Sequence, residues 1–120
     1  MEHSDPTRVE TPVTAGNRLT IDLDALSRNW LALAALAGSA ETAAAVKGNA
    51  YGIGVEPAVR ALARAGCRTF FVALPEEGLR VRSVAPDSTI YVLNGLATDL
   101  ASMHARANLR PVIGSIGELD

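Results

Sequence analysis

The sequence predicts an α/β fold in which short apolar strands alternate with amphipathic helices. Apolar runs begin near Thr42, Thr69, Thr89 and Leu109, and stretches with helical periodicity separate them. The 120 residues are 48% hydrophobic, enough for the core of one compact unit. Strands that alternate with helices form a parallel sheet, and their continuous apolar character indicates that both faces are covered.

One further strand and helix are expected before these units. Residues 18–23 alternate polar and apolar side chains, which is typical of a half-buried strand. Asp24 is the predicted N-cap of the next helix, and Gly38 ends it. The apolar positions of this helix recur at helical spacing and are Leu26, Trp30, Leu33 and Ala37. Residues 1–17 are polar and predict a disordered tail.

The first strand–helix unit begins with a strand at residues 42–46. Pro57 marks the start of its helix and Gly66 the end. The later units follow the same order, with strand 69–74, helix 75–85, strand 89–94, helix 99–107 and strand 109–113. Because a complete (β/α)₈ barrel has about 250 residues, these units amount to about half of one. The expected fold is therefore an incomplete (β/α)₈ barrel of about four units.

The last predicted element indicates a fragment. Ser115 and Glu118 form a capping box that predicts another helix, and the sequence ends at Asp120. A half-barrel exposes the edges of its first and last strands and apolar surface that later units would cover. We therefore expect self-association or dependence on a missing partner.

Charge and composition exclude several classes of function. The net charge is −2 and the arginines are scattered, which argues against a nucleic-acid partner. No apolar stretch is long enough to span a bilayer. Cys67 is the one cysteine, and its apolar surroundings predict a buried thiol in a reducing compartment. We expect a soluble, cytoplasmic protein that acts on small molecules.

Lys47 is the one lysine of the chain, beside ten arginines. It follows the strand at residues 42–46, at the carboxyl end where α/β folds place their active groups. Unlike arginine, lysine can lose its proton and form a Schiff base with an aldehyde. The alternative is a lysine whose ammonium group is simply solvated.

Tyr51 and the glycines around it lie in the turn after this strand. The Tyr51 phenol could donate a hydrogen bond to a phosphate or carboxylate near the lysine, or its ring could pack over the turn. The spacing of Gly48, Gly52 and Gly54 matches no phosphate-binding motif and instead predicts tight backbone geometry.

The other titratable residues receive structural interpretations. Glu76 and Glu77 fall in the first turn of a helix, where acids interact favourably with the helix dipole. His104 is expected on the solvated side of its helix. The histidines and the cysteine have no metal-binding spacing, so no metal is predicted.

Five segments resemble, in order and spacing, the amino-terminal part of alanine racemase, a fold type III enzyme dependent on pyridoxal 5′-phosphate (PLP). They read RLTIDLDALSRNWLALAAL, AAAVKGNAYGIG, FFVALPEEGLRVR, IYVLNG and LRPVIGSIGEL. The strongest signature is V-K-x-N-A-Y-G together with the preceding I-D-L-D-A-L. The resemblance covers residues 18–120, which implies the amino-terminal portion of a PLP-binding barrel after a tail at residues 1–17.

The resemblance also implies the roles of three residues. Lys47 would bind PLP covalently and act as one of two bases that move the substrate α-proton, Tyr51 would hydrogen-bond the cofactor phosphate, and Leu93 would line the cofactor pocket. The implied enzyme is a homodimer that interconverts L- and D-alanine and supplies D-alanine for cell-wall peptidoglycan. Alanine is then the substrate, with no nucleic acid or membrane as partner.

Some features depart from the family pattern or leave alternatives open. Gly48 and Gly78 stand where alanine is common, and Ile53 where many members have histidine. The family's second base and its pyridine-binding arginine come from segments beyond Asp120, so the chain alone is expected to be inactive. One alternative is another fold type III enzyme, either a broad-specificity amino-acid racemase or a decarboxylase. The other is a non-catalytic chain that binds PLP or pairs with another subunit.

Overall fold

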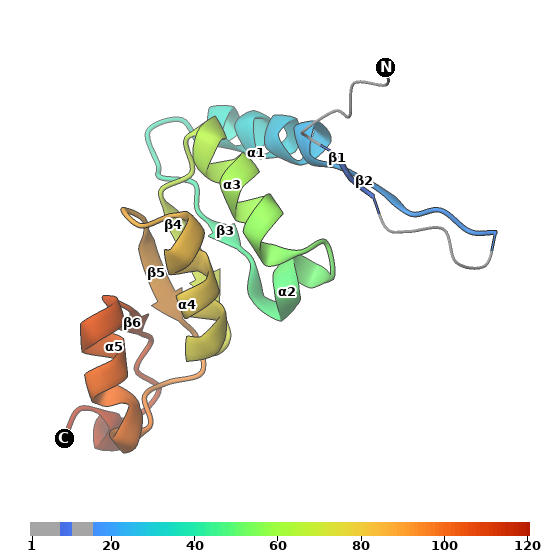
Figure 1. Cartoon of the computed structure of the whole chain (residues 1–120). Coiled ribbons are helices and arrows are strands. Elements are labelled where there is room, and N and C mark those ends of the chain that lie inside the picture. Colours follow the sequence, from blue (N-terminus) through green and yellow to red (C-terminus); the bar gives the residue numbers. More distant parts are fainter. Residues whose placement is uncertain (1–7, 11–15) are drawn as a thin grey trace.

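The computed structural model describes residues 8–10 and 16–120 and has a four-stranded parallel sheet at its centre (Figure 1). Its strands are β3 (Ala44–Ala45), β4 (Thr69–Val72), β5 (Thr89–Val92) and β6 (Arg110–Pro111). They pair in the order β3-β4-β5-β6, so neighbours in the sheet are neighbours in the sequence. This order is that of a (β/α)₈ barrel, and the predicted incomplete barrel is confirmed.

Helices connect the strands and cover one face of the sheet. The connections contain α3 (Val55–Ala65), α4 (Pro75–Val84) and α5 (Ala101–Ala107), the last preceded by the 3₁₀ turn η1 (Thr98–Leu100). Figure 1 shows α3 and α4 side by side along the strands. The predicted start of α3 at Pro57 is wrong by two residues, because the Asn49 side chain accepts the N–H of Val55 and so extends the helix to that residue.

The core lies between this face and the helices. Alternate residues of β4 and β5 are fully buried together with side chains from α3 and α4, and the largest are Phe70, Val72, Ile90, Val92, Val55, Val59 and Val81. Each side chain of this size contributes about 1.5–3 kcal/mol when fully buried. Cys67 is buried in the same cluster, as predicted, and burial raises the pKa of its thiol.

The opposite face of the sheet is different. Phe71 of β4 and Tyr91 of β5 are only half-buried there, and their rings stack with centroids 5.1 Å apart. Among the described residues no helix covers them, so the expectation that both faces are covered is wrong for this face. In a barrel this is the side that faces the interior.

The amino-terminal elements form a separate layer. A two-stranded antiparallel sheet pairs β1 (Arg8–Glu10) with β2 (Thr20–Asp22), and α1 (Leu23–Ala37) follows. Asp22, and not Asp24, caps α1, because its Oδ1 accepts the N–H of Ala25 at 3.0 Å. Most of the tail predicted at residues 1–17 lies outside the described residues, but β1 is a strand where a disordered segment was expected.

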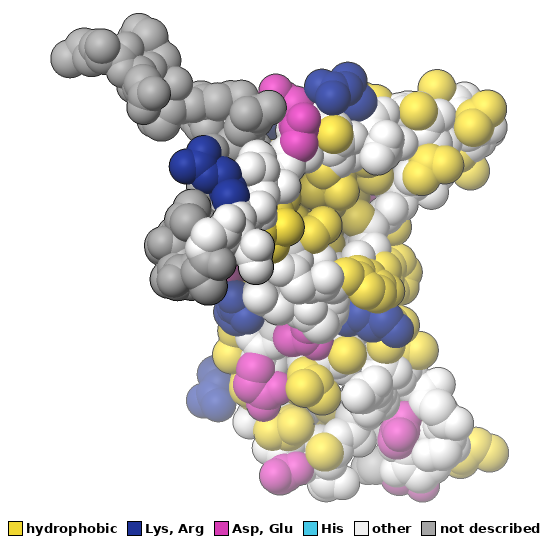
Figure 2. All heavy atoms as spheres, turned by 90° about the vertical axis from the view of Figure 1, so that its right-hand side faces the viewer, with side chains coloured by type: hydrophobic (Ala, Val, Ile, Leu, Met, Phe, Trp, Pro, Cys, Tyr) yellow, Lys and Arg dark blue, Asp and Glu magenta, His cyan; other side chains and the backbone are white. Residues whose placement is uncertain are grey.

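α1 packs against α3 and ends at Gly38, as predicted. Leu26 and Trp30 pack against the core, whereas Leu33 is 60% exposed and Leu36 is 85% exposed. The predicted stripe of Leu26, Trp30, Leu33 and Ala37 is therefore partly buried at its first two positions and exposed at its last two. Figure 2 shows hydrophobic side chains gathered on the surface at the height of α1.

Two predictions near the carboxyl end are wrong. Ile116–Glu118 form a single 3₁₀ turn, η2, and the Ser115 side chain makes no capping hydrogen bond there, although Glu118 accepts the N–H of Gly114 at 2.7 Å. His104 is buried, with its Nδ1 3.0 Å from the Leu100 carbonyl oxygen, because α5 packs against α4. In the described part of the chain, no helix has the length and apolar character needed to cross a membrane.

Candidate active site

The carboxyl ends of the parallel strands bring two predicted site residues to one edge of the sheet. Ala45 and Tyr91 both pair with Phe71, and Lys47 and Leu93 each follow two positions later. The N–H of Val46 donates to Phe71, and that of Leu93 donates to Val72, each at 2.8 Å, so the ladder reaches both positions. Lys47 and Leu93 therefore lie at the same edge, on strands separated by β4.

The segment after β3, α2 (Lys47–Tyr51), is a left-handed turn. Gly48, Asn49 and Ala50 have φ of 60°, 55° and 55° with ψ of 44°, 44° and 47°, and φ of Tyr51 is 55°. A left-handed conformation costs about 1–2 kcal/mol for each residue that carries a side chain. Neighbouring groups must therefore hold this turn in place.

Glu77 at the start of α4 provides one of these contacts. Its Oε2 accepts the N–H of Gly48 at 2.6 Å, and its Oε1 accepts the N–H groups of Ala73 and Leu74 at 3.0 Å each. One carboxylate thus caps α4 and binds the residue next to Lys47. No sequence pattern indicated this contact, since Glu77 was interpreted only through the helix dipole.

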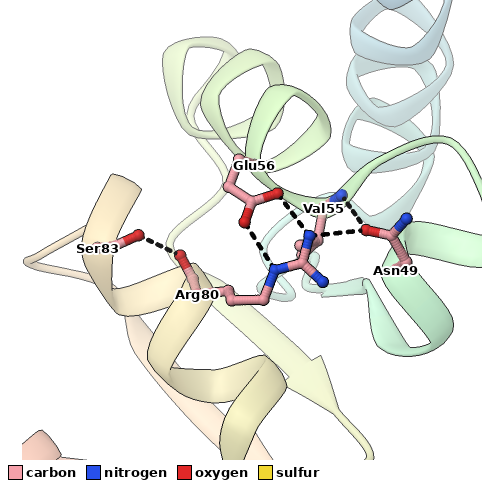
Figure 3. A network of polar contacts seen from close by, with 5 residues as sticks. All are labelled: Asn49, Val55, Glu56, Arg80 and Ser83. Atoms are coloured by element: carbon pink, nitrogen blue, oxygen red, sulfur yellow. Dashed lines mark hydrogen bonds and ion pairs between the residues drawn. The ribbon is translucent and has the colours of Figure 1, made fainter.

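A second group of contacts holds Asn49 (Figure 3). Its Oδ1 accepts the N–H of Val55 at 3.0 Å and Nη2 of Arg80 at 3.1 Å. Arg80 also donates Nε and Nη2 to the two carboxylate oxygens of Glu56, at 2.7 and 2.8 Å, which is the bidentate geometry of strong ion pairs. The hydrogen bond from Arg80 lowers the pKa of Glu56. Two successive residues of the turn are therefore held by α3 and α4.

The remaining residues of the turn divide between core and solvent. Ala50 is buried in the core, whereas Lys47 is exposed and Tyr51 is 68% exposed. A Cβ placed on Gly48 or Gly52 would meet nothing within 4 Å, so the space beside the turn is open. An exposed amine and an exposed phenol beside open space fit a ligand that carries an aldehyde and a phosphate.

A row of side chains crosses the uncovered face of the sheet next to this edge. Arg110 places its guanidinium carbon 5.7 Å from the centroid of the Tyr91 ring and donates Nη1 to the Tyr91 hydroxyl at 3.3 Å. Tyr91 in turn stacks on Phe71. This row was not predicted from the sequence, although the register of the predicted strands could have indicated it. Among the described residues, no cluster of His, Cys, Asp and Glu could hold a metal.

The parallel sheet in sequential order, with helices in its connections, defines the first part of a (β/α)₈ barrel. A family model described as "Alanine racemase, N-terminal domain" matches residues 21–120. The chain belongs to this family, and the resemblance stated from the sequence is confirmed.

Curated relatives agree with this assignment. The alanine racemase of Methylobacterium nodulans is 52% identical over 104 residues, which are 87% of this chain and 28% of that protein. The alanine racemase of Rhizobium meliloti is 43% identical over 107 residues, or 89% of this chain and 28% of that protein. The chain thus spans less than a third of the length of these relatives.

Solved structures share the fold. The alanine racemase of Bartonella henselae, described with covalently bound pyridoxal phosphate, superposes with a TM-score of 0.80 at 38% identity over 82% of this chain and 29% of that chain. The alanine racemase of E. faecalis gives a TM-score of 0.76 at 25% identity, over 82% of this chain and 27% of that chain.

Proposed function

We propose that this chain is the amino-terminal part of a PLP-dependent alanine racemase and that Lys47 binds the cofactor. The observation that carries the proposal is the position of Lys47, the one lysine of the chain, on a firmly held turn at the carboxyl edge of the sheet. The bound pyridoxal phosphate named for the Bartonella henselae relative supports the same cofactor here.

In this proposal the residues of the chain have separate tasks. The Lys47 amine binds the cofactor covalently and moves the substrate α-proton at Nζ. The exposed Tyr51 phenol donates a hydrogen bond to the phosphate, and Leu93 provides an apolar wall at the same edge. When bound, PLP supplies the electron sink that makes the substrate α-proton acidic.

In this proposal, racemisation of alanine requires residues in addition to those of this chain. The family resemblance implies that the second base and the arginine at the pyridine nitrogen come from outside this sequence, and the chain spans about 28% of its relatives. We therefore expect that the 120 residues alone bind PLP without racemising alanine. The proposal retains the expected cytoplasmic location, the homodimer, and the supply of D-alanine to cell-wall peptidoglycan.

A labelling experiment tests the role of Lys47. PLP is added to the purified chain, the product is reduced with borohydride, and the modified peptide is identified by mass spectrometry. We expect modification at Lys47 at a small excess of PLP. The variant Lys47→Arg is the control, because it keeps the charge and leaves only the terminal amine to react. Modification at Met1 alone in the unsubstituted chain would contradict the proposal.

Assays of turnover test the alternative that the chain is part of another fold type III enzyme. Alanine, serine and lysine are each tested as substrates for racemisation by the chain. Cofactor labelling at Lys47 without turnover of any of them is the expected result for this length of chain. Turnover of serine or lysine in preference to alanine would favour another fold type III enzyme.

A further inference from the structure

The turn that follows Lys47 needs support that its own backbone does not supply. Its internal hydrogen bonds join Ala50 to Val46 and Gly52 to Gly48, at 2.9 and 3.1 Å. These bonds close the turn on itself but do not fix its orientation relative to the sheet. The backbone N–H of Gly48, the residue directly after Lys47, instead donates to Glu77, which lies 29 residues further along the chain.

We propose that Glu77 is a positioning residue for Lys47: its carboxylate holds the left-handed turn against the amino end of α4 and so fixes where the lysine amine stands. The inference rests on the proposed function, in which Lys47 binds the cofactor and moves the proton. It adds a residue that touches neither the cofactor nor the substrate in that proposal.

Three backbone N–H groups donate to Glu77, and only a carboxylate can accept all of them on both of its oxygens. The N–H groups of Gly48, Ala73 and Leu74 all point at the Glu77 side chain, and both of its oxygens are used as acceptors. A glutamine has one acceptor oxygen and one NH₂ group. In a Glu77→Gln variant the NH₂ group must therefore face an N–H donor. It faces Gly48 at the lower cost, because the remaining oxygen then keeps the two donors at Ala73 and Leu74, and the contact with the turn is lost.

Glu76 provides a matched control on the same helix. It lies one residue before Glu77, it is exposed, and its side chain forms no hydrogen bond within the described part of the chain. The variant Glu76→Gln removes the same charge from the same helix turn. Any effect of Glu77→Gln that Glu76→Gln lacks therefore comes from the contacts and not from the helix dipole.

A shorter carboxylate separates the bond of Glu77 to Gly48 from its two bonds to Ala73 and Leu74. Glu77→Asp keeps the charge but shortens the side chain by one methylene. We expect it to retain the bonds to Ala73 and Leu74 within its own helix turn and to lose the bond to Gly48. If Glu77→Gln does not fold, Glu77→Asp still tests the positioning role.

The first readout needs no cofactor. Hydrogen–deuterium exchange of the 120-residue chain is followed on peptides that cover residues 47–54 and residues 73–78. For Glu77→Gln and Glu77→Asp we expect exchange in 47–54 to accelerate roughly tenfold or more, the effect of losing one charge-assisted hydrogen bond. For Glu76→Gln we expect no change. Acceleration confined to residues 73–78 would make Glu77 a helix cap alone and overturn the inference.

The second readout is the rate of borohydride-trapped PLP labelling at Lys47 in the folded chain. We expect a several-fold slower rate for both Glu77 variants than for Glu76→Gln. Equal rates would overturn the positioning role. If the unsubstituted chain shows no labelling at Lys47, the proposed function fails, while the exchange experiment still decides whether Glu77 holds the turn.

Discussion

The turn at Lys47–Tyr51 and the outer face of α1 differ in how many contacts they make with the rest of the chain. In the turn, Gly48 and Asn49 each bind a charged or polar group of a neighbouring helix, and Ala50 enters the core. On α1, Leu33 and Leu36 remain largely exposed. Residues 44–80 thus contain the contacts that shape the site, whereas α1 carries apolar surface for which the described residues provide no cover.

The substitution that should destabilise the chain most lies in the core, against which both regions pack. Phe70 is fully buried on β4, and Phe70→Ala should lower the free energy of unfolding by about 3–5 kcal/mol. Urea unfolding followed by circular dichroism measures the change. A loss below about 1 kcal/mol would mean that the sheet and helices do not form one packed core.

A second substitution acts on the turn itself. Asn49→Ala removes the acceptor for the Val55 N–H and places a less tolerant residue at φ 55°, so we expect a loss of about 1–2 kcal/mol of stability. Asn49→Asp keeps the acceptor and tolerates the left-handed conformation, and it should remain close to the unsubstituted chain. Equal losses in the two variants would show that the contacts of Asn49 do not hold the turn.

The third prediction concerns pH. The hydrogen bond from Arg80 lowers the pKa of Glu56 in the folded chain. The ion pair therefore stabilises the fold at a pH above the ordinary pKa of glutamate. This stabilisation is lost as the pH falls through the lowered pKa of Glu56, where the carboxylate is protonated. Thermal unfolding of the unsubstituted chain and of Glu56→Gln should therefore differ above the ordinary glutamate pKa of about 4.3 and converge once the pH is below the lowered pKa of Glu56. A difference that does not vary with pH would contradict this account.

The smallest effect on stability is expected on α1. Leu36 is 85% exposed, so Leu36→Ser should change the free energy of unfolding by about 0.5 kcal/mol or less. The same substitution should weaken self-association, which sedimentation velocity measures, because it removes part of the exposed apolar surface. A loss of stability comparable to that of Phe70→Ala would mean that this face is already buried in solution.

Sequence patterns predicted the helices and strands that are identified by residues within their own segments. β4, β5 and α4 appear close to their expected ranges because apolar runs and a proline at the first helical turn identify them. The cap of α1 was assigned to Asp24 and is Asp22, since two aspartates two positions apart have the same capping chemistry and only the backbone selects one.

The site was predicted in part. The place of Lys47 followed from its strand, because the carboxyl ends of parallel strands meet at one edge. The left-handed turn could not be predicted, since Ala50 and Tyr51 carry side chains that disfavour positive φ and only Asn49 of the three tolerates it. The contacts of Glu77 and Arg80 depend on how closely α4 approaches the turn, which no local pattern encodes.

The separation between Gly48 and Glu77 also has a consequence for biosynthesis. Their hydrogen bond spans 29 residues, and the one between Asn49 and Arg80 spans 31. A nascent chain that has emerged from the ribosome only as far as α3 lacks both Glu77 and Arg80, so Gly48 has no carboxylate acceptor and the Asn49 side chain is held only by the N–H of Val55. The lysine therefore leaves the ribosome on a partly held segment and reaches its final geometry only after the next strand and helix have been translated.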